Sequence, residues 1–135
     1  MATSGQGLRC HLLDFMTTEM FSIPCMQFIV FRAEDGTINW SGSYRGMKVA
    51  AALPIDDARC LILLDRMASK QEIFENLLCV ERSGNVVWKA ELPDQPDAFV
   101  EFEMTAQGLR AWTWSCWMLK LDLRTGKIIE REFVK

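Results

Sequence analysis

An arginine and two tryptophans alternate along one short stretch of the sequence, at Arg110, Trp112 and Trp114. Every second side chain of a β-strand points to the same face, so this spacing predicts that the three share one face. An indole pair beside a guanidinium can stack on a sugar, a base or a side chain of a protein partner. We therefore expect a ligand- or partner-binding site here. The alternative is that a neighbouring layer covers this face and packs on both rings.

A run of carboxylates precedes these residues, with no Lys or Arg between Ala90 and Leu109. Its members are Glu91, Asp94, Asp97, Glu101 and Glu103. Such a patch could attract a basic partner or a divalent cation. The spacing matches no calcium-binding loop, so we expect an acidic patch without a metal site. A solvated loop and sheet face is the alternative.

Nucleophilic catalysis has few candidate residues, because the chain holds five cysteines and one histidine. A Cys–His pair would have to join His11 to Cys10 or Cys25, and no third group completes it. Dinucleotide-binding, phosphate-binding and serine-hydrolase motifs are missing from the sequence. We therefore expect no catalytic residue and no cofactor, with a small enzyme that uses an unrecognised site as an alternative.

Composition and charge describe an ordinary globular protein, with 50% hydrophobic and 24% charged residues. The net charge of −3 argues against non-specific binding to nucleic acid or to an anionic membrane. The odd cysteine count, without a CxxC pair, indicates reduced thiols. Asp14 and Glu19 interrupt the apolar stretch after Arg9, so we expect neither a signal peptide nor a membrane span. These features predict a cytoplasmic protein.

The elements that must position the candidate residues are β-hairpins, and one hairpin pattern occurs three times. Each copy has an apolar run, a polar turn that ends in Gly, and a β-branched residue two positions later. The copies span residues 28–40, 77–88 and 119–130, with turn glycines at Gly36, Gly84 and Gly126. Trp40 and Trp88 hold the same place in the first two copies, where we expect packing roles.

Further strands are predicted around these copies, at residues 47–53, 59–65, 98–104, 109–114, 117–123 and 128–134. Residues 60–64 are apolar at every position, which predicts a strand covered on both faces. Strict alternation from Ala98 to Met104 places Glu101 and Glu103 on the same face as Phe99. The sequence thus predicts one all-β domain over residues 1–135. It holds an irregular segment at 1–24 and an antiparallel meander of about ten strands at 25–135.

The turn glycines lie 48 and 42 residues apart (Gly36 to Gly84, Gly84 to Gly126), which suits four short strands per repeat. Residues 119–129, Leu-Lys-Leu-Asp-Leu-Arg-Thr-Gly-Lys-Ile-Ile, resemble the strand-turn-strand of PQQ-like and WD-type β-propeller repeats. Residues 36–40 and 84–88 are similar to the Gly-to-Trp end of that motif, whereas Glu130 replaces the Trp in the third copy. The resemblance implies about two and a half propeller blades. Because a closed propeller needs at least four, copies could assemble into a ring. A single barrel or sandwich is the alternative.

These patterns favour a non-catalytic protein-interaction module of the adaptor or immunity type, which presents sheet faces and loops to a protein partner or to a second copy of itself. The competing hypothesis is a protein that binds a sugar or nucleotide through Arg110, Trp112 and Trp114.

Overall fold

The computed structural model describes residues 18–69, 73–93 and 96–134, and within them the fold is all-β, as predicted. The first elements along the chain are β1 (Thr18–Ile23), η1 (Pro24–Met26), β2 (Phe28–Arg32), β3 (Ile38–Ser41), β4 (Val49–Pro54), β5 (Arg59–Leu64), η2 (Arg66–Ala68) and β6 (Ile73–Phe74). They are followed by β7 (Leu77–Glu81), β8 (Val86–Lys89), β9 (Asp97–Thr105), β10 (Gly108–Thr113), β11 (Trp117–Leu121) and β12 (Ile128–Phe133). The two η elements are single turns of 3-10 helix. None of the described helices is long and apolar enough to cross a membrane.

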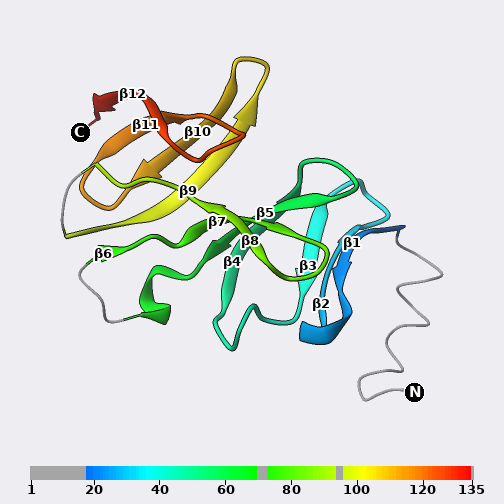
Figure 1. Cartoon of the computed structure of the whole chain (residues 1–135). Helices are drawn as coiled ribbons and strands as arrows, with labels where there is room; N and C mark the ends of the chain where they lie inside the picture. The colour runs from blue at the N-terminus through cyan, green and yellow to red at the C-terminus, as the bar shows by residue number, and fades with distance from the viewer. Residues whose placement is uncertain (1–17, 70–72, 94–95, 135) are drawn as a thin grey trace.

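The strands form three separate sheets that follow one another along the chain, except that the short strand β6 precedes β7 and β8 but belongs to the third sheet (Figure 1). The first sheet has the order β1-β2-β3, the middle sheet β4-β5-β7-β8, and the third sheet β12-β11-β10-β9-β6. All pairings between neighbouring strands are antiparallel except the short pairing of β6 with β9, which is parallel. Each predicted glycine hairpin lies at the end of one sheet, as β2–β3, β7–β8 and β11–β12.

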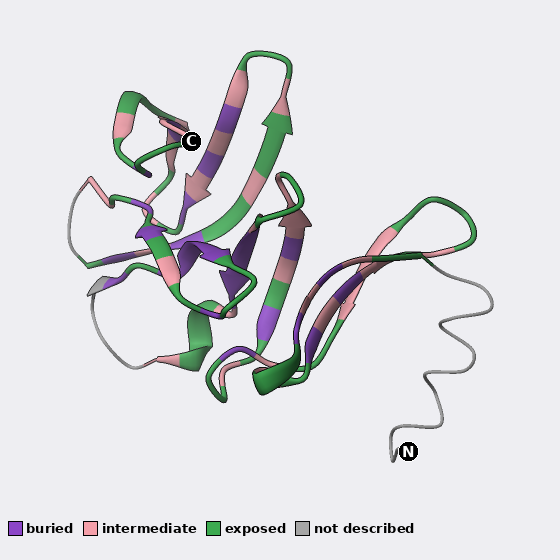
Figure 2. Ribbon diagram, turned by 45° about the vertical axis from the view of Figure 1, so that its right-hand side comes forward, coloured by how far each residue is buried: buried purple, intermediate pink, exposed green. Residues whose placement is uncertain are grey.

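The two central strands of the middle sheet, β5 and β7, are buried on both faces, because the other two sheets pack against them (Figure 2). On β5, Cys60, Ile62 and Leu64 belong to the core shared with the first sheet. Leu61 and Leu63 belong to the core shared with the third sheet. A strand covered on both sides has no polar face, which is why this stretch is apolar throughout. The prediction for residues 60–64 is confirmed.

The first and third sheets bury only the face that meets the middle sheet. In the first sheet, Phe21, Ile23, Phe28 and Val30 are at most 1% exposed and point inward. The third sheet likewise buries the residues that face the middle sheet, which are Phe99, Leu109, Ala111, Leu119 and Leu121. Within the described residues, the stack is therefore open at both ends, with one sheet face turned outward at each end.

Two parts of the chain differ from the prediction. Strand β1 lies within residues 1–24, which we expected to be irregular, and it pairs along β2. The connection after β5 holds one short turn, η2, and also the two-residue strand β6, which joins the third sheet beside β9. In both stretches, apolar and polar residues alternate over too few positions to indicate a strand.

A β-bulge in β9 reverses the predicted orientation of the glutamates. Thr113 pairs with Phe99, and Trp112 pairs with Glu101, so Val100 is an extra residue without a partner. Phe99 is buried, whereas Glu101 and Glu103 lie across from Trp112 and Arg110 on the opposite face. The prediction that these glutamates share a face with Phe99 is wrong, because the extra residue shifts the two-residue period by one.

Candidate binding surface

The outward face of the third sheet carries two rows of side chains that cross four strands. One row runs Glu103, Arg110, Lys120, Glu130, and the other runs Glu101, Trp112, Met118, Glu132. We call these eight residues the outer face. They alternate with the buried residues Leu109, Ala111, Leu119 and Leu121, and each is exposed or half-exposed. An apolar centre with a charged border therefore faces away from the core.

Two predicted site residues, Arg110 and Trp112, lie together on this outer face. The guanidinium carbon of Arg110 is 5.8 Å from the centre of the Trp112 ring. The Nη2 of Arg110 donates to Glu103 Oε1 at 3.0 Å, which is also an ion pair. Its Nε is a buried donor that has no partner among the described residues. Arg110 therefore holds one glutamate and covers part of one indole.

The third predicted residue, Trp114, has a different neighbour. It follows the last residue of β10, its side chain is 62% exposed, and its backbone N–H donates to Ala98 O at 2.8 Å. The guanidinium carbon of Arg66, from η2, lies 3.9 Å from the centre of its ring. The predicted set of three thus divides into two arginine–tryptophan pairs, Arg110 with Trp112 and Arg66 with Trp114.

The predicted acidic patch is also divided. Glu101 and Glu103 belong to the outer face, and Asp94 lies outside the described residues. Glu91 Oε1 accepts the backbone N–H of Ile128 at 2.9 Å, so it fastens the start of β12. The carboxylate of Asp97 is buried, and its Oδ1 accepts from the backbone N–H groups of Ala98 and Ser115. Two of these carboxylates therefore hold the backbone.

Groups that could do chemistry are scarce among the described residues. No three or more of their His, Cys, Asp and Glu side chains gather where a metal ion could bind. Cys60 and Cys79 are fully buried, and burial raises the pKa of the Cys60 thiol to about 12 and also raises that of Cys79. Cys25 and Cys116 are exposed. Cys10 and His11 lie outside the described residues, so the predicted Cys–His alternatives are not placed.

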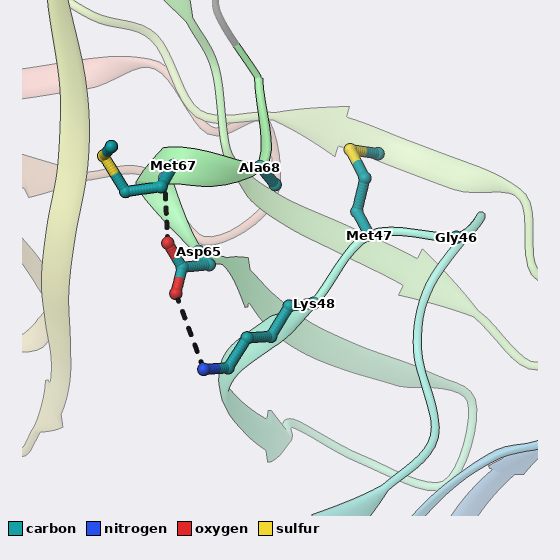
Figure 3. A pocket seen from close by; sticks show the side chains of 6 residues that line it. All are labelled: Gly46, Met47, Lys48, Asp65, Met67 and Ala68. Carbon is teal, nitrogen blue, oxygen red and sulfur yellow. Dashed lines mark hydrogen bonds and ion pairs between the residues drawn. The ribbon is translucent and has the colours of Figure 1, made fainter.

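One shallow pocket lies between the start of β4 and η2, with a volume of about 270 Å³ (Figure 3). Its lining residues are Gly46, Met47, Lys48, Asp65, Met67 and Ala68. Asp65 holds two of them, because Oδ1 accepts the Met67 backbone N–H at 2.8 Å and Oδ2 lies 3.9 Å from Lys48 Nζ. The pocket adjoins Arg66, whose Nη1 is 3.6 Å from Met67 Sδ.

The sequence did not predict four of the eight residues of the outer face, nor the two residues of η2 that lie near Trp114. On β11 and β12, every second residue points outward, namely Met118, Lys120, Glu130 and Glu132. This two-residue alternation is visible in the sequence, but these residues were assigned only to the third hairpin. Arg66 and Met67 follow β5 by a few residues and reach Trp114 only through the fold. No local pattern identifies such a long-range contact.

Comparison with known proteins gives one match. No curated protein and no solved structure matches the chain. A family model described as "Domain of unknown function (DUF7957)" matches residues 47–133, which span the middle and third sheets from just before β4 to the end of β12. The matched region contains the outer face, Arg66 and Trp114, and it covers more than half of the chain. The chain therefore belongs to the DUF7957 family.

Proposed function

We propose that this chain is a non-catalytic protein-interaction module and that the outer face of the third sheet receives a protein partner. The observation that carries the proposal is the position of this face in the stack. In the first and middle sheets, the face that corresponds to it packs against the next sheet. In the third sheet no sheet of the described chain follows, and Trp112 and Met118 are left half-exposed at its centre.

The tryptophans of the hairpin repeat support the view that the outer face corresponds to the covered faces of the first and middle sheets. Trp40 Nε1 donates to Val49 O of the middle sheet at 3.1 Å, and Trp88 Nε1 donates to Leu123 O beyond β11 at 2.9 Å. Trp40 therefore bonds to a strand of the next sheet, and Trp88 bonds to the turn that joins two strands of the next sheet. Glu130 holds the same place in the third copy, four residues after the turn glycine, and it is exposed. A carboxylate there suits a partner that brings positive charge.

The charge of the outer face favours a different, basic protein over a second copy of the chain. Its four glutamates against Arg110 and Lys120 leave a net formal charge of −2. Two such faces pressed together would repel each other, whereas a basic rim around an apolar contact would be attracted. Trp, Met and Arg are enriched at the centres of protein interfaces, and here they occupy the middle of the face. Localisation in the cytoplasm is part of the same proposal, with Cys60 and Cys79 kept as buried thiols.

The proposal is tested by photo-crosslinking in the cells that produce the protein. A benzophenone amino acid replaces Met118 at the centre of the outer face. We expect a discrete crosslinked protein that is lost when Glu101 and Glu132 are both changed to Lys, because their carboxylates border the centre.

The matched control carries the same photo-reactive group at Val87, which is 44% exposed on the edge strand of the middle sheet. We expect no crosslink there. Equal crosslinks from both positions, or none from position 118, would count against the outer face as the binding surface.

A further inference from the structure

Three side chains from two distant parts of the chain form a second exposed cluster, which we call the Trp114 cluster. Its members are Arg66, Met67 and Trp114. Met67 is 75% exposed and Trp114 is 62% exposed, the two highest values among the large exposed hydrophobic side chains of the described chain. Arg66 connects them, because its guanidinium covers the indole and approaches the Met67 sulfur. Scattered apolar residues are ordinary on a surface, but an adjacent Trp, Arg and Met are typical of an interface centre.

Two aspartates fix the two turns that carry this cluster. Asp65 caps η2, since its Oδ1 accepts the Met67 N–H, and its backbone oxygen accepts the Ala68 N–H at 2.8 Å. Asp97, which is 4% exposed, fixes the turn after Trp114 through the Ser115 N–H at 3.1 Å. Both turns are thus set before any partner arrives. A preorganised surface loses less conformational entropy on binding than a mobile one.

The charge of the cluster identifies the chemistry of its occupant. No described carboxylate forms an ion pair with Arg66, whereas Asp65 already serves Lys48 and the turn. A guanidinium that lies over an indole ring can still direct N–H groups at its edge to a carboxylate, as two parallel hydrogen bonds. The adjoining pocket of about 270 Å³, walled by Met47 and Met67, has room for an apolar side chain beside that carboxylate.

We propose that the Trp114 cluster binds a short segment of a partner protein in which Asp or Glu stands next to an apolar side chain. The carboxylate pairs with Arg66, and the apolar side chain enters the pocket beside Met67. This inference rests on the interaction role proposed above, but it uses residues outside the outer face and the opposite charge preference. The two sites are therefore separable by experiment.

The test is a selection of random linear peptides displayed on phage against the full chain. We expect the selected peptides to share an acidic residue adjacent to an apolar one. A synthetic copy of the best peptide should bind the Trp114→Ala variant at least about 10-fold more weakly, a change of about 1.4 kcal/mol, because Trp is among the residues whose truncation at an interface centre costs most. When the Arg66→Glu variant is the target of the selection, the selected peptides should instead carry Lys or Arg at the place of the acidic residue.

Two controls separate this site from others. Lys89→Glu makes the same change of charge sign at an exposed position on β8, and Trp112→Ala alters only the outer face. Neither should change the affinity of the selected peptide. Near-ultraviolet circular dichroism checks that each variant is folded. The proposal is overturned if selection gives no common acidic–apolar pattern, or if Trp114→Ala and Arg66→Glu bind the peptide as wild type does. Loss of binding only in Trp112→Ala would assign the peptide to the outer face instead.

Discussion

One buried amide holds the middle and third sheets together. Asn76 is fully buried between β6 and β7, and its Nδ2 donates to Leu64 O and to Phe99 O at 2.8 Å each. Its Oδ1 accepts the Phe99 N–H at 2.7 Å. Leu64 is the last residue of β5, and Phe99 comes directly after Ala98, where the pairing of β6 with β9 ends. Backbone groups at such positions need another partner when they are buried. The side chain replaces the missing pairing.

We expect Asn76→Ala to lower the free energy of unfolding by about 3 kcal/mol or more, because it leaves buried backbone groups without partners. Urea unfolding followed by tryptophan fluorescence measures the change. Asn85→Ala is the matched control, since Asn85 is exposed in the β7–β8 turn, and it should change stability by less than about 0.5 kcal/mol. Similar losses in the two variants would show that Asn76 does not join the sheets.

The buried thiol of Cys60 makes stability depend on alkaline pH. Burial raises the pKa of this thiol from 9.0 to about 12. The folded protein therefore holds the proton more tightly than the unfolded chain does. The resulting stabilisation is fully present below about pH 9 and is lost as the pH rises toward 12.

We expect Cys60→Ala to be less stable than wild type by about 1–2 kcal/mol at neutral pH, because it removes buried atoms. The difference should shrink between about pH 9 and about pH 11, since only wild type loses the thiol contribution there. Urea unfolding at several pH values measures both free energies. Cys116→Ala, at an exposed thiol, should show no such trend. A constant difference between wild type and Cys60→Ala would contradict this account.

At the scale of the elements, the turn glycine of one hairpin packs against the sheet that comes before it. Gly84 lies against Ile23 and Met26 of the first sheet region, and Tyr44 Oη donates to its carbonyl at 2.6 Å. Gly126, at φ +76°, lies so close to Trp88 that a Cβ would overlap the indole atom Cε3. These glycines serve two purposes, a left-handed turn and a close contact between sheets.

We expect Gly126→Ala to cost about 3 kcal/mol or more, which combines backbone strain at positive φ with displacement of Trp88. Thermal unfolding measures the loss. Gly36→Ala separates the two causes, because Gly36 has φ +89° and open space where its Cβ would lie. It should cost only about 1–2 kcal/mol. Equal costs at the two glycines would mean that the contact with Trp88 is unimportant.

The elements show which features a sequence can reveal. The apolar run at 60–64 predicted a strand that is buried on both faces, and the Gly turns predicted the hairpin at the end of each sheet. Both features depend only on residues close together in the sequence. The bulge at Val100 escaped detection, since an extra residue depends on the partner strand and reverses every side chain beyond it. The pair of Arg110 and Trp112 was predictable from alternation, whereas Arg66 reaches Trp114 across about fifty residues of chain.

At the scale of the whole molecule, three sheets form an open stack whose last face is charged. Edge strand β12 carries Glu130, Arg131 and Glu132 in a row, which discourages pairing with another strand. The third copy of the repeat differs from the other two mainly at Glu130, where Trp would extend the stack. The glutamate therefore works against a further sheet of the same kind.

We expect wild-type protein to sediment as a monomer and Glu130→Trp to self-associate, because the variant enlarges the apolar centre of the outer face and removes one charge. Analytical ultracentrifugation at several concentrations measures the masses. Glu132→Gln removes a charge without adding an aromatic ring and should stay monomeric. A wild-type dimer that dissociates on Trp112→Ala would instead identify a second copy as the partner.

The most direct measurement is the affinity of the protein crosslinked at position 118 for purified wild type, Trp112→Ala and Val87→Ala, by isothermal titration calorimetry. If the outer face is the recognition surface, Trp112→Ala should weaken binding about 30-fold, the effect of losing about 2 kcal/mol at an interface centre, and Val87→Ala should have no effect. Unchanged affinity in Trp112→Ala, with both variants folded, would contradict the claim that this face binds the partner.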